Sequence, residues 1–180
     1  MDAIIDTANI SKYHEYLDES LLVGWTKCAE YLIEKHDCYQ LNVGHKSIEN
    51  GTYNEHLFKI KTQKSDTSKI PNTAQSVDIV EWAGVVMGLL ITQLIRPWKF
   101  FKVEKRGGGY DYCYIPLDSD NNEYEYIEMT ATETPNGAKN RLNNKIEKFS
   151  EKFPGKLGYI SVTCFPDKLQ FFWAQKNDTN

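Results

Sequence analysis

The sequence predicts a mixed α/β fold in which helices cover the faces of one sheet. Three observations support this class. The chain of 180 residues is 41% hydrophobic and 26% charged, which is a globular composition with enough apolar residues for one core. Some segments repeat their apolar residues with helical spacing, and others alternate apolar and polar residues as strands do. The two kinds of segment are interleaved along the chain, as in a layered α/β domain.

The N-terminal part is predicted as a helix followed by a β-hairpin. Residues 10–36 carry apolar side chains at steps of three, four or seven, which is typical of an amphipathic helix. Residues 39–43 and 56–62 alternate as two strands around the turn signal Asn50-Gly51, and the polar segment 63–73 reads as an exposed loop. The apolar stripe of the expected helix consists of Ile10, Leu17, Leu21, Cys28 and Leu32.

The second half is predicted as the core of the fold. Residues 75–95 are apolar on nearly all sides, which indicates a buried helix, and Pro97 ends it. The elements expected after it are a strand at 98–104, a turn at 106–109, a strand at 110–115, a turn at 118–122, a strand at 123–132, a helix at 136–153 and strands at 158–164 and 169–174. We therefore expect one domain, 1–180, with 1–74 as an added helix-and-hairpin layer and 75–174 as the core.

Several classes of protein are disfavoured. The first residues, MDAIIDTANISKY, have neither the basic nor the apolar region of a signal peptide. Polar residues interrupt the apolar stretch 77–95, so it favours a buried helix over a membrane span. The four cysteines show neither paired nor zinc-binding spacing and are predicted to be reduced. We expect a cytoplasmic protein that is not associated with a membrane.

Charge is distributed unevenly along the chain. The net charge of −4 disfavours binding of nucleic acid by bulk charge alone. Residues 1–95 contain 8 Lys+Arg and 13 Asp+Glu, whereas residues 96–180 contain 13 and 12. The candidate nucleic-acid contacts in this second part are Lys102, Lys105, Arg106, Lys139 and Arg141. An ordinary solvated helix face is the alternative interpretation of the last two.

Three acidic residues are candidates for chemistry. Glu81 lies in the apolar helix, where a carboxylate needs a partner unless it occupies a solvated edge or caps the first turn. Asp111 follows three glycines on the second core strand, and Glu128 lies on the third. Neighbouring strands can bring two carboxylates to one divalent cation, and Mg²⁺ prefers such oxygen ligands.

Five tyrosines occupy the second and third core strands and admit two interpretations. They could form a cross-strand ladder that packs under helices, or a surface on which nucleic-acid bases stack. The ladder is the simpler interpretation. The five are Tyr110, Tyr112, Tyr114, Tyr124 and Tyr126.

The segments EWAGVVMGLL, VEKRGGGYDYCYI and YIEMTATE resemble the PD-(D/E)XK nuclease superfamily, which has the restriction-endonuclease-like fold. The resemblance covers about half the chain and implies an αβββαβ core at residues 75–164, extended here by the N-terminal helix and β-hairpin. It implies that Asp111 is the aspartate of the PD motif, with Tyr110 in place of proline. It further implies that Glu128 is the first acid of (D/E)XK and that Glu81 is the helix acid that holds metal through water.

The resemblance has one departure in its motif. Thr130 stands where the superfamily has a lysine that orients the attacking water, and a hydroxyl carries no positive charge. Lys102, Lys105, Lys139 or Arg141 could supply that charge from another element.

Two functions follow from the resemblance. One is hydrolysis of nucleic-acid phosphodiesters with Mg²⁺ or Mn²⁺ held by Asp111, Glu128 and the carbonyl group of Met129. The other is an inactive nuclease fold that binds a protein partner, as an accessory or antitoxin- or immunity-like subunit of a bacterial defence or conflict system. The sequence does not indicate an oligomeric state.

Overall fold

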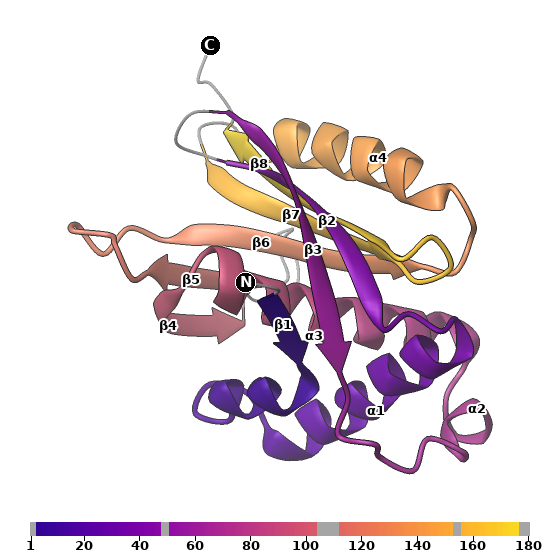
Figure 1. Cartoon of the computed structure of the whole chain (residues 1–180). Coiled ribbons are helices and arrows are strands. Elements are labelled where there is room, and N and C mark those ends of the chain that lie inside the picture. Colours follow the sequence, from indigo (N-terminus) through magenta and orange to yellow (C-terminus); the bar gives the residue numbers. More distant parts are fainter. Residues whose placement is uncertain (1–2, 48–50, 104–111, 153–155, 177–180) are drawn as a thin grey trace.

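A computed structural model of the chain describes residues 3–47, 51–103, 112–152 and 156–176. Strands and helices are interleaved along the whole chain (Figure 1). In chain order they are β1 (Ala3–Asp6), the 3₁₀ helix η1 (Thr7–Tyr13), α1 (Glu19–Lys35), β2 (Gln40–Lys46), β3 (Tyr53–Lys61), α2 (Ile70–Thr73), α3 (Ser76–Ile95), β4 (Trp98–Val103), β5 (Tyr112–Pro116), β6 (Glu125–Thr132), α4 (Gly137–Lys152), β7 (Leu157–Cys164) and β8 (Leu169–Lys176).

All the described strands belong to one mixed sheet of eight strands, in the order β1-β3-β2-β8-β7-β6-β5-β4. Strands β4, β5 and β6 form an antiparallel meander, and β7 runs parallel to β6 after the crossover through α4. The N-terminal hairpin joins the same sheet, because β2 pairs with β8. Helices α1 and α3 cover one face and α4 covers the other (Figure 1). The predicted mixed α/β class is thereby confirmed.

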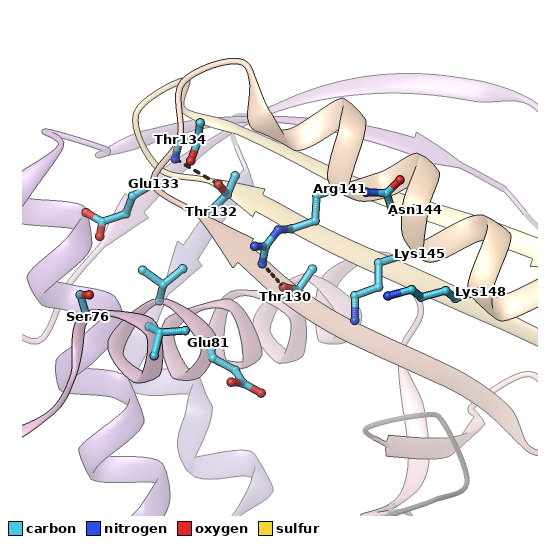
Figure 2. A pocket seen from close by; sticks show the side chains of 12 residues that line it. Ser76, Glu81, Thr130, Thr132, Glu133, Thr134, Arg141, Asn144, Lys145 and Lys148 are labelled. Carbon is cyan, nitrogen blue, oxygen red and sulfur yellow. Dashed lines mark hydrogen bonds between the residues drawn. The ribbon is translucent and has the colours of Figure 1, made fainter.

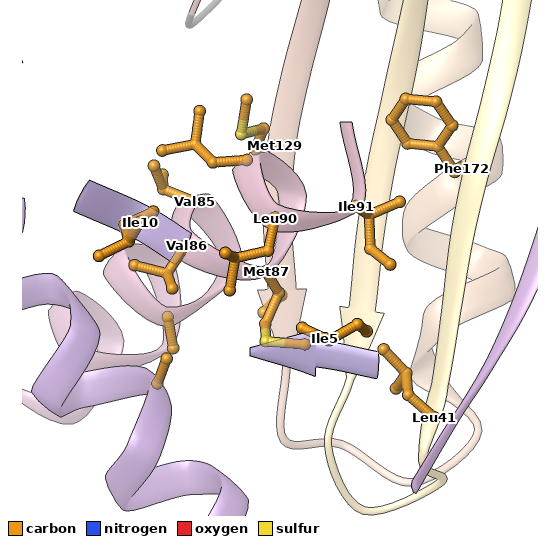
Figure 3. Close-up of a cluster of buried hydrophobic side chains, with 14 of the residues drawn as sticks. Ile5, Ile10, Leu41, Val85, Val86, Met87, Leu90, Ile91, Met129 and Phe172 are labelled. Atoms are coloured by element: carbon orange, nitrogen blue, oxygen red, sulfur yellow. The ribbon is translucent and has the colours of Figure 1, made fainter. Parts of the chain in front are cut away.

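Helix α3 forms the centre of the larger core (Figure 3). Its length and apolar composition would allow it to cross a membrane. However, 61% of its apolar 18-residue stretch is buried within the fold, as expected of a core helix. Two glycines let it approach β6 closely. A Cβ atom on Gly84 would lie 2.6 Å from the backbone nitrogen of Ala131, and one on Gly88 would lie 2.6 Å from the sulfur of Met129. The predicted buried helix is thus confirmed.

Helix α4 is amphipathic and packs against β7 and β8 on the opposite face of the sheet. Its buried side chains Ala138, Leu142 and Phe149 contact a second cluster that includes Ile160 and Val162. The remaining surface of the helix is polar, and its cations Arg141, Lys145 and Lys148 line a cavity beside β6.

The N-terminal part departs from the prediction. The single helix expected at residues 10–36 is divided into η1 and α1, because Asp18 caps α1: its Oδ1 accepts hydrogen bonds from the backbone N–H groups of Ser20 and Leu21. Leu21, expected in the buried stripe, is 52% exposed. Strand β1 was not predicted, and the expected loop at 63–73 ends in the short helix α2. All four cysteines are free and buried, consistent with the reduced state expected of them.

Candidate functional site

A cavity of about 550 Å³ lies between the start of α3, the second half of β6 and α4 (Figure 2). Among the described residues, β5 pairs with β6 only at residues 125–127, so residues 128–132 are paired on the β7 side alone. The cavity opens beside this part of β6. It is lined by Ser76, Val77, Val80, Glu81, Thr130, Thr132, Glu133, Thr134, Arg141, Asn144, Lys145 and Lys148.

Strand alternation determines which side chains of β6 reach the cavity side. Ile127, Met129 and Ala131 are buried in the core that contains α3. Glu128 and Thr130 therefore point to the opposite face, where α4 lies. The contacts of Glu128 and Thr130 with α4 agree with this placement.

Helix α4 places two cations on these two β6 residues (Figure 2 shows the second contact). Lys145 Nζ forms an ion pair with Glu128 Oε1. Arg141 Nη1 donates hydrogen bonds to Thr130 Oγ1 at 2.8 Å and to the carbonyl oxygen of Ala131 at 2.7 Å. Arg141 and Lys145 are four residues apart, so they lie on one face of the helix.

The ion pair is partly shielded from solvent. The Glu128 side chain is 14% exposed and that of Lys145 is 28% exposed. Burial makes an unpaired carboxylate unfavourable, so the Lys145 ammonium group stabilises the charge of Glu128. Lys148 lines the same cavity and adds a further positive charge. The α4 side of the cavity is therefore suited to an anionic ligand.

Glu133 ties the end of β6, at the cavity rim, to helix α1. Its Oε1 accepts hydrogen bonds from Lys35 Nζ at 2.6 Å and His36 Nε2 at 2.7 Å. Burial acts to raise the pKa of Glu133, but the bonds from Lys35 and His36 outweigh it and hold that pKa below its ordinary value.

The described predicted acids, Glu81 and Glu128, differ in their exposure and in their position relative to the cavity. Glu81 is exposed and lines the cavity, in agreement with the solvated-edge alternative and not with a buried carboxylate. Glu128 is half-buried beside the cavity and paired with Lys145. The side chain of Met129 packs toward Gly88, away from the cavity side. Asp111 lies outside the described residues.

The predicted cations are also divided. Arg141 lines the cavity. Lys139 is exposed on α4 and does not line the cavity. Lys102 lies on β4, with its Nζ 4.7 Å from the ring centroid of Tyr124, and is likewise outside the cavity lining. Lys105 and Arg106 fall outside the described residues.

Lys145 and Lys148 were not among the predicted site residues. Their spacing from Arg141, at i+4 and i+7, gives one basic face of α4, and this is the signal in the sequence that could have found them. This spacing does not identify β6 as the neighbour of the basic face, because the neighbour depends on how α4 packs on β7.

The donor set bears on whether a metal ion fits here. Within the part of the chain that the structure describes, no group of three or more His, Cys, Asp or Glu side chains could hold a metal ion. The described residues do provide carboxylate oxygens from Glu81 at the cavity and Glu128 beside it. In this structure the cation held against Glu128 is the Lys145 ammonium group, and the two described carboxylates alone do not make up a metal site.

The fold and the cavity thus define a mixed α/β protein with a cation-lined cleft where α3, β6 and α4 meet. No family model, curated protein or solved structure gives a significant match to this chain. The functional assignment therefore rests on the geometry of the cleft and on the order of the elements around it.

Proposed function

We propose that this protein is a metal-dependent nuclease-like phosphodiesterase with a restriction-endonuclease-like core, and that the cleft between α3, β6 and α4 is its active site. The observation that carries the proposal is the placement of Arg141 and Lys145 on Thr130 and Glu128. These two β6 positions are the ones that correspond to the acid and the lysine of the (D/E)XK motif.

The order of elements supports the proposal. Helix α3 is followed by the β4-β5-β6 meander, by α4 and by β7 parallel to β6, which is an αβββαβ arrangement. The close approach of α3 to β6 at Gly84 brings the helix that carries Glu81 next to the strand that carries Glu128.

The residues around the cleft would divide the work of hydrolysis. Asp111, Glu128 and the carbonyl group of Met129 would hold Mg²⁺ or Mn²⁺, which when bound lowers the pKa of a coordinated water and offsets charge on the phosphate. Glu81 would position water near this group. Arg141 would bind a non-bridging phosphate oxygen, since its guanidinium group can donate several hydrogen bonds in one plane.

Arg141 would compensate for the departure at Thr130. The hydroxyl of Thr130 carries no charge, but it accepts a hydrogen bond from Arg141, and this guanidinium group would supply the positive charge that the motif lysine supplies in the superfamily. Lys145 would release Glu128 on metal binding and then face the phosphate. The positive charge thus comes from α4 and not from β6.

One observation favours a second function. The ion pair between Lys145 and Glu128 neutralises the motif acid, which is also what an inactive nuclease fold would tolerate. In that case the protein would act in the cytoplasm as an interaction module for a protein partner, for example in a bacterial defence system. Such a module needs the surface of the cleft but no metal.

Cleavage assays distinguish the two functions. Labelled single-stranded and duplex DNA and RNA are incubated with Mg²⁺ or Mn²⁺ and with wild type, Arg141→Ala or Lys139→Ala. We expect metal-dependent cleavage by wild type and Lys139→Ala, and a loss of about a hundredfold or more in Arg141→Ala, because Arg141 contacts the reacting phosphate. Absence of cleavage of every substrate would reject the nuclease and leave the interaction module.

A further inference from the structure

The tyrosines of β5 and the β6 region lie on two different faces of the sheet. Tyr112 and Tyr114 are buried on the α3 face, where Tyr114 Oη donates to Glu125 Oε2 at 2.9 Å. Tyr124 is 41% exposed and Tyr126 is half-buried. Cys113 lies between the two buried tyrosines on β5, so its side chain points to the opposite face, where α4 lies. Tyr126 pairs with Cys113 and therefore faces the α4 side as well. Tyr112 and Tyr114 are therefore packed under α3, whereas Tyr124 and Tyr126 keep part of their surface exposed on the opposite face of the sheet.

Tyr124 and Tyr126 belong to a surface that alternates rings and cations. Phe100 is 36% exposed and meets Tyr124 edge-on, with ring centroids 6.2 Å apart. Lys102 Nζ lies 4.7 Å from the ring centroid of Tyr124, and Lys156 Nζ lies 5.8 Å from that of Tyr126. We call these five residues, Phe100, Lys102, Tyr124, Tyr126 and Lys156, the aromatic track.

The aromatic track is continuous with the cleft. Residues 124, 126, 128 and 130 alternate along one face of β6 and the residue before it, so the row of tyrosines leads to Glu128 and Thr130. At about 3.4 Å per residue the row is about 20 Å long. Its far end carries Arg141, Lys145 and Lys148. The main acidic group within this row, Glu128, is already ion-paired.

We infer that the aromatic track binds a single-stranded nucleic acid whose backbone continues into the cleft. This rests on the proposed function, because it names the substrate of the same site. Aromatic rings stack on any base, whereas the bases of a duplex are already stacked on one another and offer no face to Tyr124 or Tyr126. Each lysine above a ring holds positive charge within reach of the phosphate of a base stacked there.

The chemistry of the surface favours a nucleic acid over an acidic polypeptide. Cations alone would attract either polymer, but the exposed rings of Tyr124 and Phe100 add an interaction that carboxylate side chains cannot provide. The alternation of ring and cation therefore matches a ligand that itself alternates aromatic bases and anionic phosphates.

The test is fluorescence anisotropy with a labelled oligonucleotide, single-stranded or annealed to its complement, in EDTA so that no metal-dependent cleavage occurs. We expect the single strand to bind wild type about tenfold or more tightly than the duplex, and Tyr124→Ala to weaken single-strand binding about tenfold. Tyr124→Phe keeps the ring and should bind as wild type does. Tyr39→Ala is the matched control, since Tyr39 is 43% exposed and precedes β2, outside the aromatic track.

Equal affinity for duplex and single strand would overturn the inference, and so would a Tyr124→Ala protein that binds the single strand as tightly as Tyr39→Ala does. Displacement of the labelled strand by poly-glutamate as effectively as by the unlabelled strand would also overturn it. Lys102→Ala gives a second variant within the aromatic track and should also weaken binding. Binding without cleavage would support the aromatic track while rejecting the catalytic proposal. Metal-dependent cleavage at an equal rate by wild type and Tyr124→Ala would support the catalytic proposal while rejecting the aromatic track.

Discussion

One guanidinium nitrogen of Arg141 contacts both the side chain of Thr130 and the backbone of Ala131, which fixes the position of its charge beside β6. Lys145, one helical turn further on, is fixed in the same way by Glu128. Under the proposed function, Arg141 would meet a phosphate group from a preorganised position, whereas Lys145 would first release Glu128. Such preorganisation is the main source of electrostatic stabilisation in active sites. At the scale of residues, the proposed function of the cleft would depend on side chains of α4 as much as on those of β6.

Glu133 predicts a pH dependence of stability. Its pKa in the folded protein is held below the ordinary 4.5, so the folded form binds this proton more weakly than the unfolded chain does. The contribution of Glu133 is therefore complete above about pH 4.5 and is lost as the pH falls through the lowered value. We expect the Tm difference between wild type and Glu133→Gln, measured by calorimetry, to be largest at neutral pH and to shrink in acid.

The exposed Glu147→Gln, on α4, provides the control for this experiment and should match the wild-type Tm throughout. A difference between wild type and Glu133→Gln that widens as the pH falls below 4.5 would contradict the role assigned to the bonds from Lys35 and His36.

Some of these residues could be predicted from the sequence and others could not. Glu128 and Thr130 share a strand face because alternation is a local property of the chain. The partnership of Glu128 with Lys145 joins residues on different elements and depends on the packing of α4. Glu30 is a similar case: it is fully buried and accepts hydrogen bonds from Thr7 and from the backbone of Gln63 and Ser65, and no pattern near Glu30 indicates these partners.

At the scale of elements, the contact between α3 and β6 depends on a glycine. A Cβ at position 84 would meet backbone atoms of Thr130 and Ala131 at 2.6 Å, and backbone cannot move aside as a flexible side chain can. We expect Gly84→Ala to lower the free energy of unfolding by about 1–3 kcal/mol, measured by urea denaturation, because α3 must shift away from β6.

Gly24→Ala is the matched control for this prediction. Gly24 is exposed on helix α1 and has open space around its Cβ position. The same substitution should raise stability there by about 0.5–1 kcal/mol, since alanine loses less conformational entropy than glycine in a helix. Destabilisation of equal size at both positions would contradict the close contact between α3 and β6.

Elements with strong periodicity were predicted well and short ones were not. Helix α3 was expected at residues 75–95 and lies at Ser76–Ile95, because a long apolar run defines the helix and Pro97 ends it. The division between η1 and α1 was missed because apolar spacing continues through residues 14–18 while the Asp18 cap starts a new helix. Strand β1 has only four residues, and its pairing with β3 is a long-range contact that local patterns do not reveal.

At the scale of the whole molecule, one sheet connects the N-terminal hairpin to the strands that carry the cleft. The order of elements after residue 75 follows from the sequence, but the pairing of β8 with β2 does not, since it joins strands more than a hundred residues apart. The net charge of −4 is an average over an acidic first part and a second part that carries the cations of α4 and the aromatic track. Local charge, and not net charge, governs which ligand the cleft accepts.

The most direct test of this account is the rate of Mn²⁺-dependent cleavage of a single-stranded oligonucleotide by Glu128→Gln, relative to wild type and to Glu147→Gln. The amide keeps the shape of Glu128 but cannot hold a divalent cation as a carboxylate does. We expect a loss of about a hundredfold or more in Glu128→Gln and no loss in Glu147→Gln. Equal rates for all three proteins, or a rate that does not depend on Mn²⁺, would contradict the assignment of the cleft as a metal-dependent phosphodiesterase site.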